Sequence, residues 1–302
     1  MKQTVLLGQI SGLRPAQQRR LERLSHRRQP ETAIADLLTL QRLAAESQEL
    51  ELPLTLVIDG RGLIRLLWIG PLAASGRLVE RLPGSQRRQG QQFRLITCIG
   101  SGRLLPPGGS EAIVGLDVSP RCWLRYPAEP EKGGHWPAAR FEPVGSAVSP
   151  WREAAHGELG DLCAEPVSGD APPPVPDRAA GGTAPQAGMG GRERVLLLAL
   201  TPADRTAAER ELNELNGLVR SAGAEPVGVV EQRRQGAIAR SLWGAGKLQE
   251  AAIEARRLGA TLVVTDRELS PSQGRDLETL LDLPVSDRSE LILDIFAQRA
   301  AS

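Results

Sequence analysis

Residues 241–302 decide the fold of this chain and read SLWGAGKLQEAAIEARRLGATLVVTDRELSPSQGRDLETLLDLPVSDRSELILDIFAQRAAS. Three short motifs follow one another in this stretch: GAGK at 244–247, DRELSPSQ at 266–273 and DRSELILDIFAQRA at 287–300. The first motif opens a pattern with apolar residues at helical spacing, and the second follows the apolar run 261–265. Helical patterns that alternate with short apolar runs predict a parallel α/β sheet.

The same alternation extends upstream to Arg194. The apolar run 195–200 predicts a buried strand, and 206–221 predicts a helix that Gly223 ends. Thr201, which precedes Pro202, is the predicted N-cap. Further strands are expected at 226–230, 262–264 and 283–285, and further helices at 247–258, 271–281 and 288–300. We therefore predict a small, right-handed parallel-sheet domain with flanking helices over residues 193–302.

The order of the three motifs resembles the amino-terminal domain of the HflX family of ribosome-associated GTPases, over roughly residues 194–300. The resemblance implies a small α/β sheet domain. In full-length relatives, a helical linker and a GTPase domain follow this point, and GTP hydrolysis with Mg²⁺ on the large ribosomal subunit is linked to splitting stalled ribosomes. The implied partners are the large ribosomal subunit and its rRNA.

The sequence departs from those relatives because it contains no G-x-x-x-x-G-K-[ST] phosphate loop. At Gly246-Lys247, Leu248 stands where a Mg²⁺-binding hydroxyl is needed, and Ser241 replaces the first glycine. An Asn-Lys-x-Asp guanine-reading motif is also missing. We expect a truncated form that keeps ribosome or rRNA binding without GTP hydrolysis. No catalytic residue and no cofactor are predicted for this chain, although ATP remains possible.

The GAGK motif has two interpretations. Gly244 and Gly246 would allow backbone amides to approach an anion, with the helix N-terminus and Lys247 adding positive charge. The anion would be an rRNA phosphate or a nucleotide, so an ATP-binding α/β domain is an alternative function. In the other interpretation, the glycines serve a tight turn and Lys247 is an ordinary exposed lysine. Ser241-Leu242 replaces an aromatic-containing pair of many relatives, which argues against base stacking.

The second and third motifs predict helix caps in place of catalytic groups. Ser270 precedes Pro271 and forms a predicted capping box with Gln273, and Asp287 forms another with Glu290. Apolar residues on the last helix form a stripe that we expect to be partly exposed or covered by another chain. These residues are Leu291, Ile292, Ile295 and Phe296.

Residues 1–150 predict a small α+β module. Helices are expected over 15–30 and 33–48, and the Asp-Gly turn at 59–62 predicts a hairpin between 52–58 and 63–69. Residues 93–99 predict a strand, and 112–118 and 123–126 are possible strands. The module resembles the extension that some HflX proteins, particularly cyanobacterial ones, carry before the common domain. That resemblance rests on GLRP at 12–15, HRRQP at 26–30 and the hairpin 59–65.

The first predicted helix is strongly basic. Glu22 is the only acidic residue between Pro15 and Pro30. Clustered guanidinium groups bind phosphates and release counterions, so a non-catalytic RNA-binding module is a second alternative function. No aromatic residue lies among the arginines, so base stacking is not indicated. Such a helix would contact the RNA backbone and would not recognise a particular base sequence. A solvated surface helix explains the pattern equally well. The candidate RNA contacts are Arg19, Arg20, Arg23, Arg27 and Arg28.

Composition sets the remaining expectations. Residues 171–191 have almost no large apolar side chain, so we predict a disordered linker over 151–192. The three cysteines form no C-x-x-C pair, and Cys163, His156 and His135 lack the spacing of a metal site. No run of about eighteen apolar residues occurs, and the start lacks a secretory signal pattern. We expect a cytoplasmic protein with no membrane span and no DNA partner.

Overall fold

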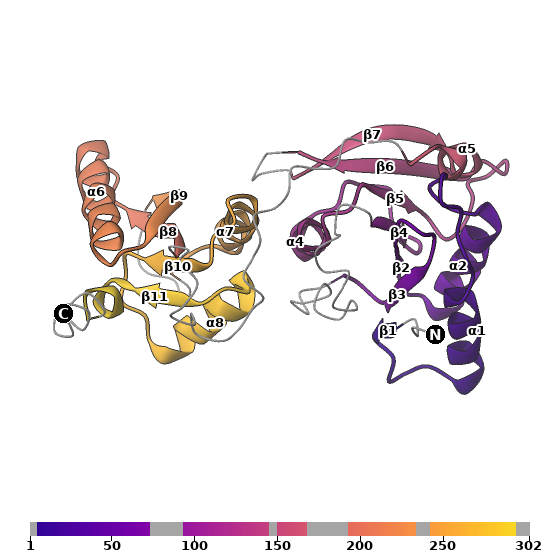
Figure 1. The fold of residues 1–302 in the computed structure, drawn as a ribbon, viewed down its shortest axis with the longest axis horizontal. Helices are drawn as coiled ribbons and strands as arrows, with labels where there is room; N and C mark the ends of the chain where they lie inside the picture. The colour runs from indigo at the N-terminus through magenta and orange to yellow at the C-terminus, as the bar shows by residue number, and fades with distance from the viewer. Residues whose placement is uncertain (1–4, 73–92, 145–149, 168–192, 234–241, 294–302) are drawn as a thin grey trace. The chain divides into compact units, whose positions relative to one another are not determined.

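The computed structural model describes residues 5–72, 93–144, 150–167, 193–233 and 242–293. The chain divides into two compact units, Met1–Pro174 and Val175–Ser302. Figure 1 shows their elements, and each unit is described here by itself. Both units combine helices with β-sheet, so the predicted α/β class is confirmed.

A mixed sheet of seven strands forms the first unit, in the order β1-β3-β2-β4-β5-β6-β7. The pairs β1–β3 and β4–β5 are parallel, and the other neighbours are antiparallel. The strands predicted over 93–99 and 123–126 are confirmed. The seven strands are β1 Val5–Gly8, β2 Leu54–Ile58, β3 Ile64–Ile69, β4 Arg94–Cys98, β5 Cys122–Tyr126, β6 Pro137–Pro143 and β7 Trp151–Glu158.

Strands β2 and β3 form the predicted hairpin, and Asp59 organises its turn. One carboxylate oxygen of Asp59 accepts hydrogen bonds from the backbone N–H groups of Arg61 and Leu63, each at 2.9 Å. An aspartate that bonds its own turn in this way is a common turn former. The other oxygen accepts a bond from Nε of Arg65 at 2.7 Å. The side chain thus holds both the turn and the start of β3.

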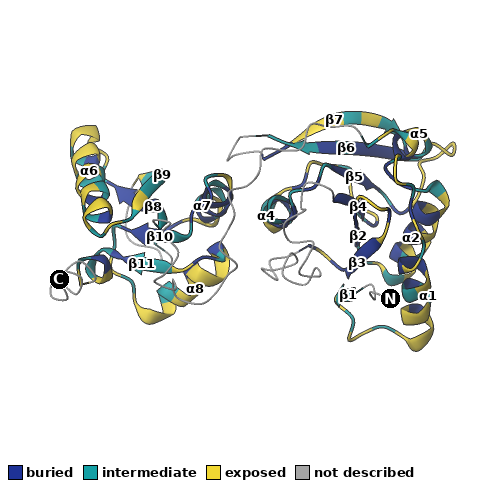
Figure 2. Cartoon of the chain, viewed as in Figure 1, coloured by how far each residue is buried: buried dark blue, intermediate teal, exposed yellow. Residues whose placement is uncertain are grey.

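Helices cover both faces of this sheet. Helices α1 (Pro15–Ser25), α2 (Leu37–Leu50) and α5 (Leu159–Ala164) contribute to one apolar core together with Leu67 and Ile69 of β3. Helix α4 (Gly109–Val118) contributes to a second core together with Leu66 and Trp68 of the same strand. Successive residues of a strand point to opposite faces. Strands β2 to β5 are therefore buried on both sides, whereas β7 is largely exposed, as Figure 2 shows.

Two predictions for the first unit are wrong. Residues 112–118 form helix α4 and not a strand, because an apolar run of this length suits a buried helix as well as a strand. Residues 151–167 are not linker but contain β7 and α5. Trp151 is 2 % exposed, and β7 pairs with β6 along its length. The remainder of the predicted linker, 168–192, lies outside the described residues.

The second helix begins later than predicted, at Leu37. The Asp36 side chain caps it by accepting a bond from the Thr39 N–H at 3.0 Å. Residues 33–35 instead run beside the segment after α5, where Ile34 donates to the Glu165 carbonyl at 3.0 Å. Long-range backbone pairing therefore overrides the local helical pattern.

Four parallel strands form the sheet of the second unit, in the order β11-β10-β8-β9. The strands are β8 Arg194–Thr201, β9 Glu225–Arg233, β10 Leu262–Thr265 and β11 Val285–Asp287. The helices are α6 Arg205–Ser221, α7 Ala245–Arg257 and α8 Pro271–Leu281, and residues 288–293 are also helical. The predicted parallel-sheet domain is confirmed.

Helices lie on both faces of the parallel sheet. Helix α6 packs with Leu215 and Val219 against Val195 and Leu197 of β8. On the opposite face, Leu258 at the end of α7 lies near Leu196, since both side chains would contact a Cβ added to Gly228. The chain therefore changes faces between β8 and β10, which makes this the topological switch point of the sheet.

The start of α6 corrects one prediction. Thr201 is the last residue of β8 and does not cap the helix. Asp204 is the N-cap, because its side chain accepts a bond from the Ala207 N–H at 2.9 Å. None of the helices in the described part of the chain is long and apolar enough to span a bilayer.

Candidate functional site at the carboxyl edge of the parallel sheet

The three sequence motifs meet at one edge of the four-stranded sheet. Gly244 follows β9, Asp266 follows β10 directly, and Asp287 ends β11. Because the strands are parallel, the segments that follow them all lie at the carboxyl edge. Ligands of open α/β sheets bind at this edge, in the crevice near the switch point. We therefore examine this edge as the candidate site.

Helix α7 begins at this edge with a glycine cap. Gly244 is the N-cap residue, with φ −69° and ψ 149°. Because glycine has no side chain, no side-chain hydrogen bond caps this helix. Neither Gly244 nor Gly246 has a positive φ, so backbone conformation does not explain either glycine. A Cβ added to Gly246 would meet no described heavy atom within 4 Å. The first turn of α7 is therefore open to a ligand that approaches the backbone closely.

The charge of Lys247 is partly neutralised in this structure. Its Nζ lies 2.7 Å from Oε2 of Glu250, one turn along α7, and its side chain is 27 % exposed. An ion pair of this kind on a helix surface contributes little to stability. A phosphate would compete with the Glu250 carboxylate for Lys247 while gaining the helix N-terminus as well.

The second motif is fastened to the end of β8. The Asp266 carboxylate accepts a hydrogen bond from the Leu200 N–H at 2.9 Å, and Arg267 donates to the Leu200 carbonyl at 3.2 Å. Ser270 and Gln273 form the predicted capping box at the start of α8, which is confirmed. These contacts give the motif a structural role at the edge.

The third motif is bonded to the second. Asp287 Oδ1 accepts from the Glu290 N–H at 3.0 Å, and the Glu290 side chain accepts from the Asp287 N–H at 3.3 Å. This confirms the second predicted capping box. Asp287 Oδ2 also accepts from the Leu269 N–H at 3.0 Å, and Ser289 donates to Glu268 at 2.9 Å. One buried carboxylate thus ties the segment after β10 to the helix after β11.

Replacing Asp287 with Ala is expected to lower the free energy of unfolding of the second unit by about 1–3 kcal/mol. The change removes a helix cap and leaves the half-buried Leu269 N–H without its acceptor. Urea unfolding followed by hydrogen–deuterium exchange of peptides from the second unit measures this effect. The same substitution at exposed Asp276 is the control, because that side chain forms no hydrogen bond or ion pair with another described residue. An equal midpoint for the two variants would contradict the assignment.

A hollow of about 400 Å³ lies between the second and third motifs. Its arginines are matched by carboxylates: Arg267 lies 3.2 Å from Asp266, and Arg288 pairs with Glu214 of α6. The hollow therefore has no excess of positive charge that would attract an anion. Its lining residues are Asp266, Arg267, Glu268, Arg288, Ser289 and Ile292.

Only the first two residues of the apolar stripe predicted for the last helix, Leu291 and Ile292, lie in the described part of the chain. Leu291 is 4 % exposed and packs with α6 against the sheet, and Ile292 is half-buried. Ile295 and Phe296 lie outside the described residues. One side of this helix thus belongs to the core of the second unit.

The five candidate arginines of the first unit lie in two different environments. Arg20 pairs with Glu46 and Glu49 of α2, Arg28 pairs with Glu31, and Arg27 lies 3.9 Å from Asp36. Arg19 and Arg23 are exposed and form no ion pair with another described residue. Three of the candidates therefore already have an anionic neighbour within the unit.

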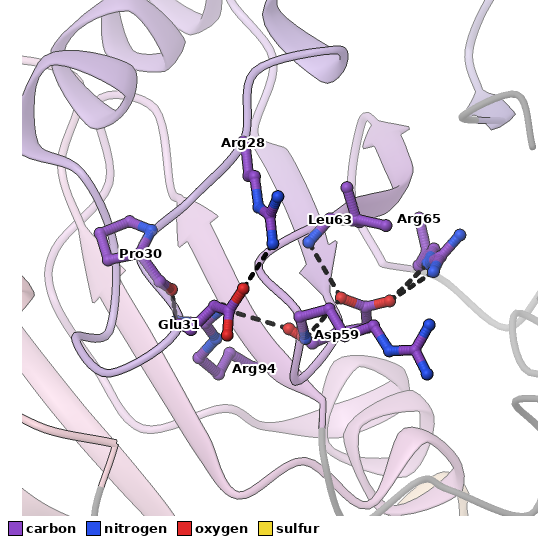
Figure 3. Close-up of polar contacts among 8 residues, drawn as sticks. Arg28, Pro30, Glu31, Asp59, Leu63, Arg65 and Arg94 are labelled. Carbon is purple, nitrogen blue, oxygen red and sulfur yellow. Dashed lines mark hydrogen bonds and ion pairs between the residues drawn. The ribbon is translucent and has the colours of Figure 1, made fainter. Parts of the chain in front are cut away.

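Sequence reasoning missed a buried polar cluster around Arg94 (Figure 3). Arg94 is 1 % exposed and donates to the backbone carbonyls of Pro30, Ala33, Ile34 and Asp59. Burial lowers the pKa of its guanidinium, and the nearby Asp59 acts in the opposite direction. The one available signal was an arginine at the start of an apolar strand. The cluster joins the segment after α1 to the hairpin turn.

The three cysteines are free thiols within the first unit. All three are buried, and burial raises the pKa of Cys122 and of Cys163 to about 11. Burial disfavours the charged thiolate form of both side chains. Within the described ranges, no group of three or more His, Cys, Asp or Glu side chains is arranged to hold a metal ion.

The fold and the edge motifs define the second unit as a small, doubly wound α/β domain. Residues 209–297 match the family described as "GTP-binding GTPase N-terminal". The GTPase HflX of Lacrimispora saccharolytica is 44% identical over 110 residues, which cover 36% of this chain and 26% of that protein. The GTPase HflX of Escherichia coli is 44% identical over 90 residues, 30% of this chain and 21% of that protein.

A third relative, the GTPase HflX of Caldanaerobacter subterraneus, is 40% identical over 113 residues, 37% of this chain and 26% of that protein. About 110 residues of this chain are thus homologous to the amino-terminal domain of HflX GTPases. The matches span about a quarter of the length of these curated relatives.

Proposed function

We propose that the second unit is a ribosome-binding domain of the HflX type that contacts rRNA phosphates through the N-terminus of α7. The observation that carries this proposal is the open, glycine-capped start of α7 at the carboxyl edge of the homologous domain. A helix N-terminus presents backbone N–H groups and the positive end of the helix dipole to an anion. The glycines keep side chains out of the path of a phosphate.

An adenine nucleotide is the alternative anion for the same helix. Nucleotides in open α/β sheets bind at the switch point, which here lies between β8 and β10. The Asp266 carboxylate stands at that point and bonds the Leu200 N–H at 2.9 Å. A carboxylate repels a phosphate at short range. We therefore favour an rRNA phosphate. Such a phosphate would approach the start of α7 from the solvent and would not enter the crevice between β8 and β10.

We further propose that these 302 residues bind large ribosomal subunits in the cytoplasm without hydrolysing GTP. The sequence contains no phosphate-loop motif to hold the β- and γ-phosphates. GTP and Mg²⁺ would belong to the GTPase domain of full-length relatives. The domain proposed here supplies the contact with the ribosome.

Replacing Gly246 with Ala is expected to weaken cosedimentation with purified large ribosomal subunits by about tenfold, or about 1.4 kcal/mol. The added Cβ has open space in the free protein, and Ala in a helix is more favourable than Gly by about 0.5–1 kcal/mol. A loss of binding therefore reflects the ligand and not the fold. The assay is run at two salt concentrations, with and without ATP.

Gly217→Ala in α6 is the matched control, because its Cβ also has open space and it lies near the end of a helix. We expect this variant to pellet like the wild type. Unchanged pelleting of Gly246→Ala, or no pelleting of the wild type at low salt, would contradict the proposal. Pelleting that requires ATP would favour the nucleotide alternative.

A further inference from the structure

The arginines of the first unit divide into neutralised and unpaired groups. Arg20 Nε lies 2.6 Å from Glu46, and Arg20 also pairs with Glu49. It therefore serves the packing of α1 on α2. Arg19 and Arg23, one helical turn apart, are exposed and form no ion pair with another described residue. Arginines without an internal carboxylate are free to bind an external anion.

Helix α2 adds another arginine to this surface. Gln17 contacts Glu49 at 3.1 Å, and Arg27 lies 3.9 Å from Asp36, so the two helices run antiparallel. Arg23 of α1 and Arg42 of α2 both lie between these two contacts along their helices. Arg42 is exposed and also forms no ion pair with a described residue.

The hairpin turn adds an arginine from a distant part of the sequence. The Gln29 N–H donates to the Gly62 carbonyl at 2.7 Å, so the turn lies against the segment that follows α1. A Cβ added to Gly62 would lie only 2.0 Å from the Gln29 carbonyl oxygen. Arg61, which is exposed, therefore belongs to a turn that packs against the residue after Arg28.

We propose that Arg19, Arg23, Arg42 and Arg61 form an RNA-binding surface on the first unit, here called the arginine face. Exposed guanidinium groups bind phosphates and release counterions from the nucleic acid. Residues 11–65 contain no Phe, Trp or Tyr, so the arginine face lacks both base-stacking groups and the aromatic anchors of protein interfaces. This favours recognition of an RNA backbone over recognition of an acidic protein or of a base sequence.

The test uses the full chain with a short, fluorescently labelled single-stranded RNA, and anisotropy is measured over a series of salt concentrations. The variant Arg19→Gln/Arg23→Gln/Arg42→Gln is expected to bind at least about tenfold more weakly at low salt. Three lost phosphate contacts should also make the slope of log K against log salt shallower by about 2. Exposed substitutions of this kind change stability by only about 0.5 kcal/mol each, so the fold is retained.

Arg20→Gln is the matched control on the same helix, and it is expected to keep the wild-type affinity and salt slope. Equal affinity and slope for the triple variant and the wild type would overturn the proposal. Absence of wild-type RNA binding at low salt, or a preference for DNA of the same length, would also overturn it. Gly246→Ala leaves the arginine face intact. The ribosome-binding role proposed for the second unit is therefore tested independently of RNA binding by the first unit.

Discussion

Replacing Arg94 with Met is expected to lower the free energy of unfolding of the first unit by about 3–5 kcal/mol. The guanidinium donates to the Pro30 carbonyl at 2.8 Å, to the Ile34 and Asp59 carbonyls at 3.2 Å each, and also to Ala33. Met fills much of the same space but donates no hydrogen bond. Several carbonyl groups would then stay buried without a partner, and the segment after α1 would lose its attachment to the sheet.

Urea unfolding monitored by tryptophan fluorescence measures this effect. The first unit contains Trp68, Trp123, Trp136 and Trp151, and a Trp243→Phe background removes the signal of the second unit. Arg42→Met is the control, because Arg42 is exposed and its loss should change stability by no more than about 0.5 kcal/mol. A variant Arg94→Met that unfolds at the wild-type midpoint would show that the cluster contributes no stability.

Gly115→Ala is expected to destabilise the same unit by about 1–3 kcal/mol. A Cβ on this residue of α4 would lie 2.3 Å from the Trp123 ring and 2.7 Å from the Trp151 ring. The two rings pack edge to face with centroids 5.0 Å apart, and each indole N–H is hydrogen-bonded. Neither ring can move without losing these contacts, so the helix must shift away from the sheet.

The matched control is Gly274→Ala in α8, where an added Cβ meets no described atom within 4 Å. This change should stabilise the second unit by up to about 1 kcal/mol, because Ala suits a helix better than Gly. Thermal unfolding of the two variants should therefore shift in opposite directions. A shift to higher temperature for Gly115→Ala would show that the tryptophan pair adapts to the added methyl group.

The order of elements in the second unit was predictable because its signals are local. Apolar runs such as 195–200 and helical spacing such as Leu248 with Ala252 repeat within a few residues. The two capping boxes, at Ser270 and Asp287, were predictable for the same reason, since each joins residues only three positions apart. The N-cap of α6 was misplaced at Thr201, because several polar residues precede that helix and each suits the position.

The first unit was harder to predict, because its decisive contacts join distant residues. Helix α4 was taken for a strand because a short apolar run suits both structures, and only its packing on Trp123 and Trp151 separates them. The segment 151–167 was assigned to the linker, although pairing with β6 orders it. The sequence presents the candidate arginines as one group, and the structure separates Arg20, Arg27 and Arg28, which have anionic neighbours, from Arg19 and Arg23.

By itself, the sequence determined the alternation of strands and helices, the parallel sheet of the second unit, its helix caps and its three motifs. Periodicity and capping depend on neighbours within one or two helical turns, which the sequence displays directly. Only the tertiary structure decided that Asp266 bonds to Leu200, that Asp287 joins two motifs, and that Arg94 is buried among carbonyls. Such partners lie far apart in the chain, and packing of the whole unit selects which polar groups meet.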